Sequence, residues 1–265
     1  MSALALSAPD LAIGAALVVA SAATSIALRL QVHRQLLWAA ARMVVQLLLV
    51  GLVLRAVFRA DSPGATVLIA LLMVGAAVRE VAVRPATRLR GLRNVPISAF
   101  VVGGSSIATV CLALSTAIQP SPWYDPRYAI PLMGIVLGTV LNSASLALDT
   151  FYGGLAAGRA AIEAQLALGA TMREALTPHR RDAIRRGLIP LVNQMSAAGI
   201  ITLPGVMTGR LLAGMDPLES VKYQILLLFL LTGAGFLAAA GAVRLAAAAV
   251  SDERQRLRMD RLQGR

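Results

Sequence analysis

The sequence predicts an all-α protein that crosses a membrane about seven times. Of its 265 residues, 57% are hydrophobic and only 14% are charged, and the mean hydropathy is +0.72. A soluble domain could not hide that much apolar surface, because its own exterior must be polar. A bilayer core about 30 Å thick takes a helix of about 20 residues. Seven apolar stretches of suitable length cover residues 8–29, 36–58, 64–83, 96–118, 129–150, 189–212 and 220–248.

The positive charges predict how these helices are oriented. All the basic residues except Lys222 are arginines, and the net charge is +12. With the N-terminus outside, most arginines fall in the loops after the first, third and fifth stretches and in the tail at about 249–265, which would all face the cytoplasm. We therefore expect a multi-pass protein of the inner (cytoplasmic) membrane of a bacterium, with its C-terminus inside. Arginines at the ends of apolar stretches favour contact with membrane lipid over nucleic acid.

The longest polar interruption, at about 151–188, predicts a cytoplasmic loop with helical parts. Ile162 and Leu166 lie four residues apart, so they would share the apolar face of a short helix. Gly169 would end this helix, and Thr171 followed by Glu174 is typical of a capping box that begins another. Such an amphipathic helix could place its apolar face in a groove of a soluble partner. An ordinary surface helix is the alternative.

The same interruption holds further signals at its C-terminal end. Thr177 and Pro178 have the pattern of an N-cap and a first helical residue, so we expect a separate basic helix that runs into Gly187. His179 in this helix is expected at the surface. The only other histidine is His33, which argues against a two-histidine metal site.

The chain lacks the motifs of an enzyme. No phosphate-binding Gly-x-x-x-x-Gly-Lys-Ser/Thr loop is present, and the single cysteine, Cys111, leaves no thiolate cluster for zinc. We therefore expect no catalytic residue and no cofactor in this chain. Any pumping would take its energy from a partner chain or from an ion gradient.

Polar and helix-breaking residues inside two of the stretches indicate a substrate pathway. Pro204 would kink or break the sixth stretch, and irregular backbone at membrane depth is tolerated where it lines a cavity. The alternative is that amide and hydroxyl groups only hold helices together. Thioether sulfur could bind a soft metal, although most methionines are expected to serve packing. The candidates are Asn142 and Ser143 in the fifth stretch and Asn193, Gln194, Met195, Pro204, Gly205 and Met207 in the sixth.

Several of these segments resemble a known family of transporters. Glu163, Ala164 and Gly169 match the coupling motif of ABC-transporter permeases, in which Gln165 would be alanine. The C-terminal half resembles the FetB-like iron-export permeases, to which the aluminium-tolerance half-transporters of plants are related. The resemblance is carried by Met133–Asp149, Ile162–Thr171, Leu188–Asn193, Gly199–Gly214 and Asp216–Gln224. Thr139 departs from the asparagine that is more common there.

The resemblance implies a function and partners. It implies a single permease domain over residues 1–265, linked to iron export and driven by a separate ATP-binding subunit that carries ATP and Mg²⁺. One coupling segment per chain implies a homodimer with two ATPases. The implied coupling residues are Ile162, Glu163, Ala164, Leu166, Gly169 and Thr171.

Two other classes of function remain open. A gradient-driven carrier or channel would need no ATPase, and a membrane scaffold would transport nothing. An acidic residue deep in a span would favour the carrier, but the acidic residues lie near the ends of the apolar stretches or in loops. Their placement therefore favours the ABC permease.

Overall fold

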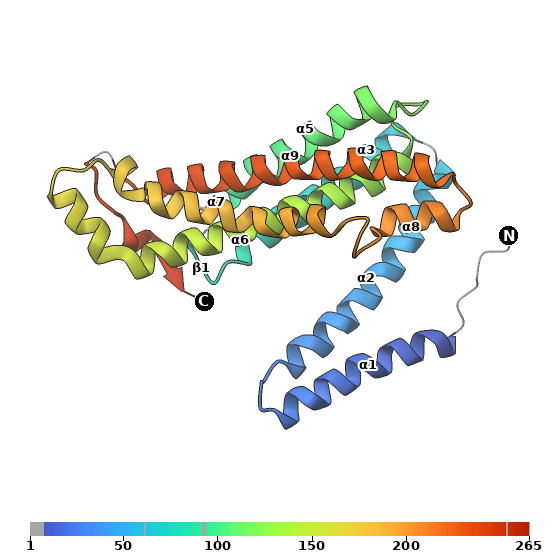
Figure 1. The fold of residues 1–265 in the computed structure, drawn as a ribbon, viewed down its shortest axis with the longest axis horizontal. Coiled ribbons are helices and arrows are strands. Elements are labelled where there is room, and N and C mark those ends of the chain that lie inside the picture. Colours follow the sequence, from blue (N-terminus) through green and yellow to red (C-terminus); the bar gives the residue numbers. More distant parts are fainter. Residues whose placement is uncertain (1–7, 61, 92–93, 253, 265) are drawn as a thin grey trace. The chain divides into compact units, whose positions relative to one another are not determined.

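The computed structural model describes residues 8–60, 62–91, 94–252 and 254–264 and confirms an all-α membrane architecture (Figure 1). The chain divides into two compact units, Met1–Asp61 and Ser62–Arg265. We call them the helical pair and the core unit, and we describe each by itself.

The helical pair consists of α1 (Ala8–Ala27) and α2 (His33–Ala60). The turn between them uses left-handed backbone at Arg29 and Gln31, with φ of 54° and 57°. The amide of Val32 donates to Ser25 Oγ at 3.2 Å and fixes the turn. Ala22 and Ser25 are buried, whereas most side chains of α2 are exposed. The pair therefore has little core of its own.

The core unit holds the other elements. In chain order they are α3 (Pro63–Val83), β1 (Thr87–Leu89), α4 (Asn94–Ser98), the π-helical η2 (Ala99–Gly103), α5 (Gly104–Leu112), the π-helical η3 (Ala113–Ile118), α6 (Pro126–Ala167), α7 (Met172–Ala197), α8 (Gly205–Leu212), α9 (Pro217–Ala249), η4 (Met259–Arg261) and β2 (Leu262–Gly264).

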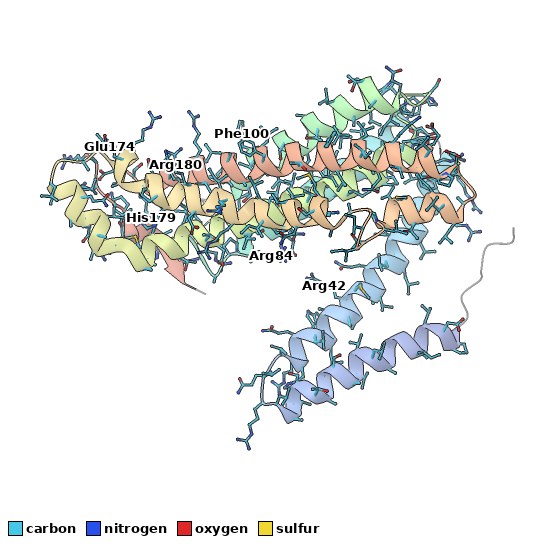
Figure 2. The ribbon with its side chains drawn as sticks, viewed as in Figure 1. Arg42, Arg84, Phe100, Glu174, His179 and Arg180 are labelled. Carbon is cyan, nitrogen blue, oxygen red and sulfur yellow. The ribbon has the colours of Figure 1, made fainter. Side chains whose placement is uncertain are left out.

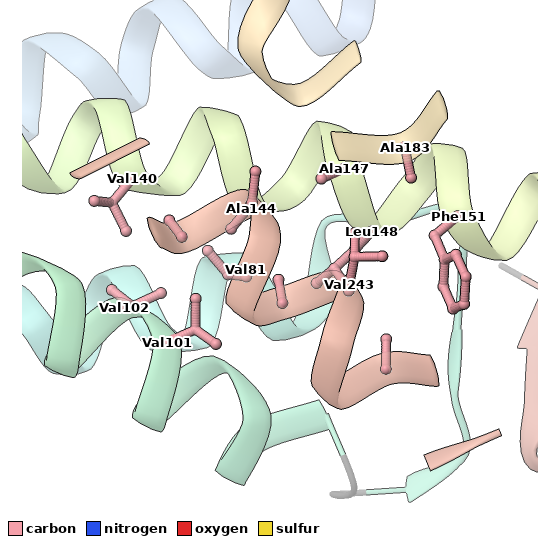
Figure 3. Close-up of a cluster of buried hydrophobic side chains, with 14 of the residues drawn as sticks. Val81, Val101, Val102, Val140, Ala144, Ala147, Leu148, Phe151, Ala183 and Val243 are labelled. Carbon is pink, nitrogen blue, oxygen red and sulfur yellow. The ribbon is translucent and has the colours of Figure 1, made fainter. Parts of the chain in front are cut away.

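Helix α6 is the centre of this unit and packs against α9, α7, α3 and α5. Small side chains let these helices approach closely, and Ala144, Ala147 and Ala183 are fully buried among larger apolar ones (Figure 3). A Cβ atom at Gly187 of α7 would lie 2.8 Å from the Ser143 carbonyl oxygen and 3.3 Å from Ala239 Cβ. The crossing of α6, α7 and α9 therefore depends on a residue without a side chain.

The span over Asn94–Ile118 contains two wide turns of π-helix, η2 and η3. Hydroxyl groups bond carbonyls at both places: Ser105 Oγ donates to the Val101 carbonyl and Thr116 Oγ1 to the Leu112 carbonyl, each at 2.6 Å. These bonds satisfy backbone acceptors where the regular helical ladder changes.

The tail folds back onto the rest of the core unit. Strand β2 pairs antiparallel with β1, with Arg88 opposite Gln263. Arg261 Nη1 donates to the carbonyl of Ala249 at 2.7 Å and so caps the end of α9. Gln255 Oε1 accepts from the Met172 amide at 2.7 Å, at the start of α7. We call these contacts of residues 251–264 the tail clasp.

The prediction of about seven spans is close to what the structure shows. Within the described residues, six helices are long and apolar enough to cross a membrane. The expected span at 189–212 is divided between the end of α7 and the short α8, because the helix is interrupted over 198–204. Gly199 adopts a φ of 84° there, and Pro204 is the N-cap of α8, so the predicted break at Pro204 is confirmed.

The predicted division of residues 151–188 into a loop with separate short helices differs from the structure. Helix α6 continues unbroken to Ala167, and α7 begins at Met172. No separate helix starts at Thr177 and Pro178, since α7 passes through both and Thr177 Oγ1 donates back to the Arg173 carbonyl at 2.7 Å. Gly187, expected to end that helix, lies inside α7. The buried side chains of Ala175, Leu176 and Ala183 keep the helix in place despite the backbone hydrogen bond that the proline removes.

Candidate functional site

The end of α6 and the start of α7 form a tight helical hairpin around the predicted coupling segment. Gly169 has a φ of 94°, a left-handed conformation that favours glycine, and it ends α6 as the sequence predicted. Thr171 and Glu174 form the predicted capping box, in which the Glu174 carboxylate accepts from the Thr171 amide at 2.8 Å. The turn is therefore fixed at both of its ends. We call residues 159–176 the hairpin tip.

The capping box also sets the charge of the tip. The pKa of Glu174 is lowered, first by the hydrogen bond from the Thr171 amide and then by the bond from its hydroxyl. The carboxylate therefore stays ionised at neutral pH. A negative charge in the first turn of α7 also complements the helix dipole.

The exposed face of the hairpin tip differs from the expected one. Ile162 is 1% exposed and belongs to the chain's own core, and Leu166 is partly buried against that core. The predicted apolar face of Ile162 and Leu166 thus points inward and is not free to enter a partner's groove. The apolar side chain that does face outward is Leu168, which is 89% exposed. Glu163 is also exposed, in an ion pair with Arg159 at 2.7 Å.

His179 is not the surface residue that the sequence suggested. Its half-buried ring packs on α6 so closely that a Cβ atom at Gly158 would lie 2.8 Å from Cε1, and one at Gly154 3.2 Å from Nδ1 (Figure 2). The two glycines, four residues apart, are the small-x-x-x-small pattern of closely packed helices. This spacing is visible in the sequence and could have located the contact.

A polar pocket of about 470 Å³ surrounds Asn142 on α6. Arg84 Nη1 donates to Asn142 Oδ1 at 3.0 Å, and Asp149 Oδ1 accepts from the Ala86 amide at 2.8 Å. The hydroxyl of Ser145 lines the same pocket, is buried, and has no hydrogen-bond partner among the described residues. Pro190 of α7 completes the wall. The structure thus joins Asn142 with Ser145, a polar residue of the same predicted span, and with Arg84, which the sequence did not single out as a pathway residue.

The other predicted pathway residues do not gather at this pocket. Ser143 is buried at the crossing of α6, α7 and α9, where its Oγ would lie 2.9 Å from a Cβ atom at Gly235. Asn193 and Gln194 are exposed on α7. Met195 Sδ accepts a hydrogen bond from Thr232 Oγ1 at 3.4 Å, so its thioether is occupied within the chain.

The remaining candidates lie at the start of α8. Pro204 is half-buried, Gly205 is the exposed first residue of the helix, and Met207 is half-buried in its first turn. In the described part of the chain, no three His, Cys, Asp or Glu side chains come close enough together to hold a metal ion.

Comparison with known proteins places the chain in a family. Residues 8–250 match the uncharacterised protein family UPF0014. A UPF0014 membrane protein of Synechocystis is 42% identical over 74% of this chain and 75% of its own length. The probable iron export permease protein FetB of Escherichia coli is 32% identical over 84% of this chain and 83% of its own. The protein ALUMINUM SENSITIVE 3 of Arabidopsis thaliana is 29% identical over 77% and 73%, respectively.

No solved structure matches the chain. The match over residues 8–250 spans α1 to the end of α9, and the relatives include the two kinds of protein that the sequence motifs indicated. This chain therefore belongs to the UPF0014 family of membrane proteins, and the probable iron export permease FetB is among its relatives.

Proposed function

We propose that this chain is the membrane-spanning permease subunit of an ABC transporter that exports iron, driven by a separate ATP-binding subunit. The observation that carries the proposal is the hairpin tip, a tight helical turn at the end of the 42-residue α6. The iron substrate rests on the likeness to FetB, which is named as a probable iron export permease.

The length of α6 supports a projecting hairpin. Its 42 residues extend about 63 Å at 1.5 Å per residue, roughly twice the thickness of the hydrocarbon core. Beyond its first turn, its charged residues are Asp149, Arg159 and Glu163, which all lie in the half that leads to the hairpin tip. That half therefore suits water, and a force applied at the tip would reach the membrane along one continuous helix.

The exposed groups of the tip suit a protein partner. Leu168 offers an exposed apolar anchor, and Glu163, also exposed near the end of the same helix, offers a carboxylate for an arginine of the ATPase. The turn at Gly169 holds both in a fixed position, because the capping box at Thr171 locks the next helix. We therefore propose that docking uses Glu163, Ala164, Leu168 and Gly169, while Ile162 and Leu166 hold the tip to the core unit.

The pocket around Asn142 supports the transport part of the proposal. It lies where α6 meets α7, so it is in line with the hairpin that would receive the force. Its guanidinium, amide and hydroxyl groups, from Arg84, Asn142 and Ser145, are polar groups that a moving polar cargo could contact. Two such permeases with two ATPases would complete one transporter.

Co-purification with the ATP-binding subunit tests the proposal. We expect Leu168→Glu to abolish both the association and the stimulated ATP hydrolysis, while Leu168→Met, the matched control, keeps both. The membrane level and thermal stability should not change, since the side chain is exposed. Normal association of a stable Leu168→Glu protein would contradict docking through the tip. The mass of the detergent-solubilised complex tests the arrangement of two permeases and two ATPases.

A further inference from the structure

A second pocket of the core unit is basic and has no assigned role. It measures about 530 Å³ and lies between the start of α7, the end of α9 and the tail. The residues that matter are Arg173, Leu176, Arg180, Arg244, Ser251 and Gln255. We call it the arginine pocket. It shares no lining residue with the pocket around Asn142.

The three arginines of this pocket lack partners within the described part of the chain. None of their guanidinium groups is in an ion pair or a side-chain hydrogen bond within that part. The Nε atom of Arg180, a residue labelled in Figure 2, is buried without an acceptor. The tail arginines next to them differ. Arg256 pairs with Asp252 at 2.9 Å, and Arg258 with Asp260 at 2.8 Å.

The nearby carboxylates that the structure describes, those of Glu174 and Asp252, are engaged by other groups. Glu174, in the first turn of α7, is engaged by the Thr171 amide and hydroxyl. Asp252 is engaged by Arg256 and by the amides of Arg254 and Arg256. Arg180 is half-buried, whereas Arg173 and Arg244 are exposed. A half-buried guanidinium nitrogen without an acceptor is costly, so the pocket suits an anion that arrives from outside the chain.

The position of the pocket relative to the hydrocarbon core of the membrane indicates the source of that anion. No charged residue lies between Lys222 and Arg244 on α9, a stretch of about 33 Å at 1.5 Å per residue. This equals the thickness of the hydrocarbon core, so the two side chains lie at its opposite surfaces. Helices α7 and α9 are antiparallel, with Gly187 beside Ala239, which places Arg180 at the level just beyond Arg244. The arginines therefore lie where phospholipid phosphates are found.

We propose that the arginine pocket binds the phosphate of an anionic phospholipid. Guanidinium groups form bidentate hydrogen bonds with phosphate, and basic pockets between membrane helices bind anionic lipid headgroups. The apolar wall made by Leu176, Ala247 and Ala248 suits the glycerol end of the acyl chains. The headgroup bridges α7, α9 and the tail clasp. The pocket includes Arg173 and Leu176 of the hairpin tip, but none of the proposed docking residues Glu163, Ala164, Leu168 and Gly169 lines it.

Lipid binding to the detergent-purified chain, followed by native mass spectrometry, tests the site. We expect phosphatidylglycerol to be retained and phosphatidylcholine to be lost. The double variant Arg180→Gln/Arg244→Gln should weaken phosphatidylglycerol binding about fivefold for each arginine removed. The matched control, Arg181→Gln/Arg185→Gln, removes two exposed arginines of the same helix that do not line the pocket, and it should bind within about twofold of the wild type.

Each other outcome overturns the proposal. Equal loss in the control would mean that only surface charge attracts lipid, and unchanged binding in the double variant would mean that the lipid lies elsewhere. Displacement of the lipid by millimolar inorganic phosphate would show that the pocket takes free phosphate. If the double variant does not fold, Arg173→Gln at the exposed rim makes the same test, with a loss of about fivefold expected.

Discussion

The candidate spans of the helical pair and of the core unit are similarly apolar, but they are buried to very different extents. The most apolar window of α2 has a mean hydropathy of 2.1, yet none of it is buried within the chain, whereas half of the corresponding window of α6 is buried. Lipid tails are as apolar as leucine side chains, so apolar sequence alone does not bring membrane helices together. Close packing brings membrane helices together, and it needs small residues. Helices α6, α7 and α9 have such residues where they cross.

The largest contrast between the units is expected at glycines. Gly187→Ala would place a Cβ atom 2.8 Å from a backbone oxygen, which cannot move away, so we expect a loss of about 1–3 kcal/mol of stability. Gly51→Ala in α2 meets nothing within 4 Å and should gain roughly 0.5–1 kcal/mol. Unfolding of both variants in mixed micelles measures the difference. Equal effects would mean that the two units are packed alike.

A buried polar pair sharpens the comparison within the core unit. Tyr152 Oη donates to Asn94 Oδ1 at 3.2 Å, and Asn94 Nδ2 donates to the Ala82 carbonyl at 3.3 Å. Tyr152→Phe leaves a buried acceptor without a donor, at an expected cost of about 1–3 kcal/mol. Tyr128→Phe, at an exposed ring, is the control and should change thermal stability by less than about 0.5 kcal/mol.

A substitution in the hairpin tip should lower the stability less than one in the buried core. Thr171→Ala removes the side-chain cap of α7, and we expect a local loss of about 1 kcal/mol. Because ionised Glu174 has a lowered pKa, its contribution should be constant above the ordinary carboxyl pKa and disappear only as the pH falls through the lowered value. Hydrogen exchange at the amides of 171–176 measures both effects. A change in protection between pH 6 and pH 8 would contradict this assignment.

Removing an ion pair of the tail clasp is expected to have the smallest effect on stability. The Arg258 guanidinium lowers the pKa of Asp260 to about 2, so the pair contributes above the ordinary carboxyl pKa near 3.9 and is lost as the pH falls towards 2. Exposed ion pairs contribute little. Asp260→Asn should therefore raise the rate of trypsin cleavage after Arg258 only slightly at pH 8. Release of the whole tail by this change would mean that the ion pair, and not the β1–β2 pairing, holds it.

The sequence was most informative where one residue type determines the backbone. Gly169 and the Thr171–Glu174 capping box were predicted correctly, since each depends on neighbours in the chain. The break at Pro204 was predicted for the same reason. The family was predicted because whole segments, such as Met133–Asp149, resemble its members.

Prediction from the sequence failed where contacts between helices determine a helix end or the orientation of a side chain. Hydropathy marks how much of a helix is apolar, and not where the helix ends, so α6 was cut at residue 150. Thr177–Pro178 has a helix-start pattern, but burial of Leu176 and Ala183 outweighs it. The inward orientation of Ile162 and the place of Arg84 beside Asn142 both depend on residues far away along the chain, which no local pattern contains.

The pairing of β1 with β2 also has a consequence for the order of synthesis. Nearly all of the core unit lies between these strands along the chain, and domains begin to fold from the N-terminal side during translation. Strand β1 therefore has no pairing partner until α4 to α9 and β2 have been synthesised. The tail clasp can close only after α9 is complete, so its formation reports that the whole core unit has been made.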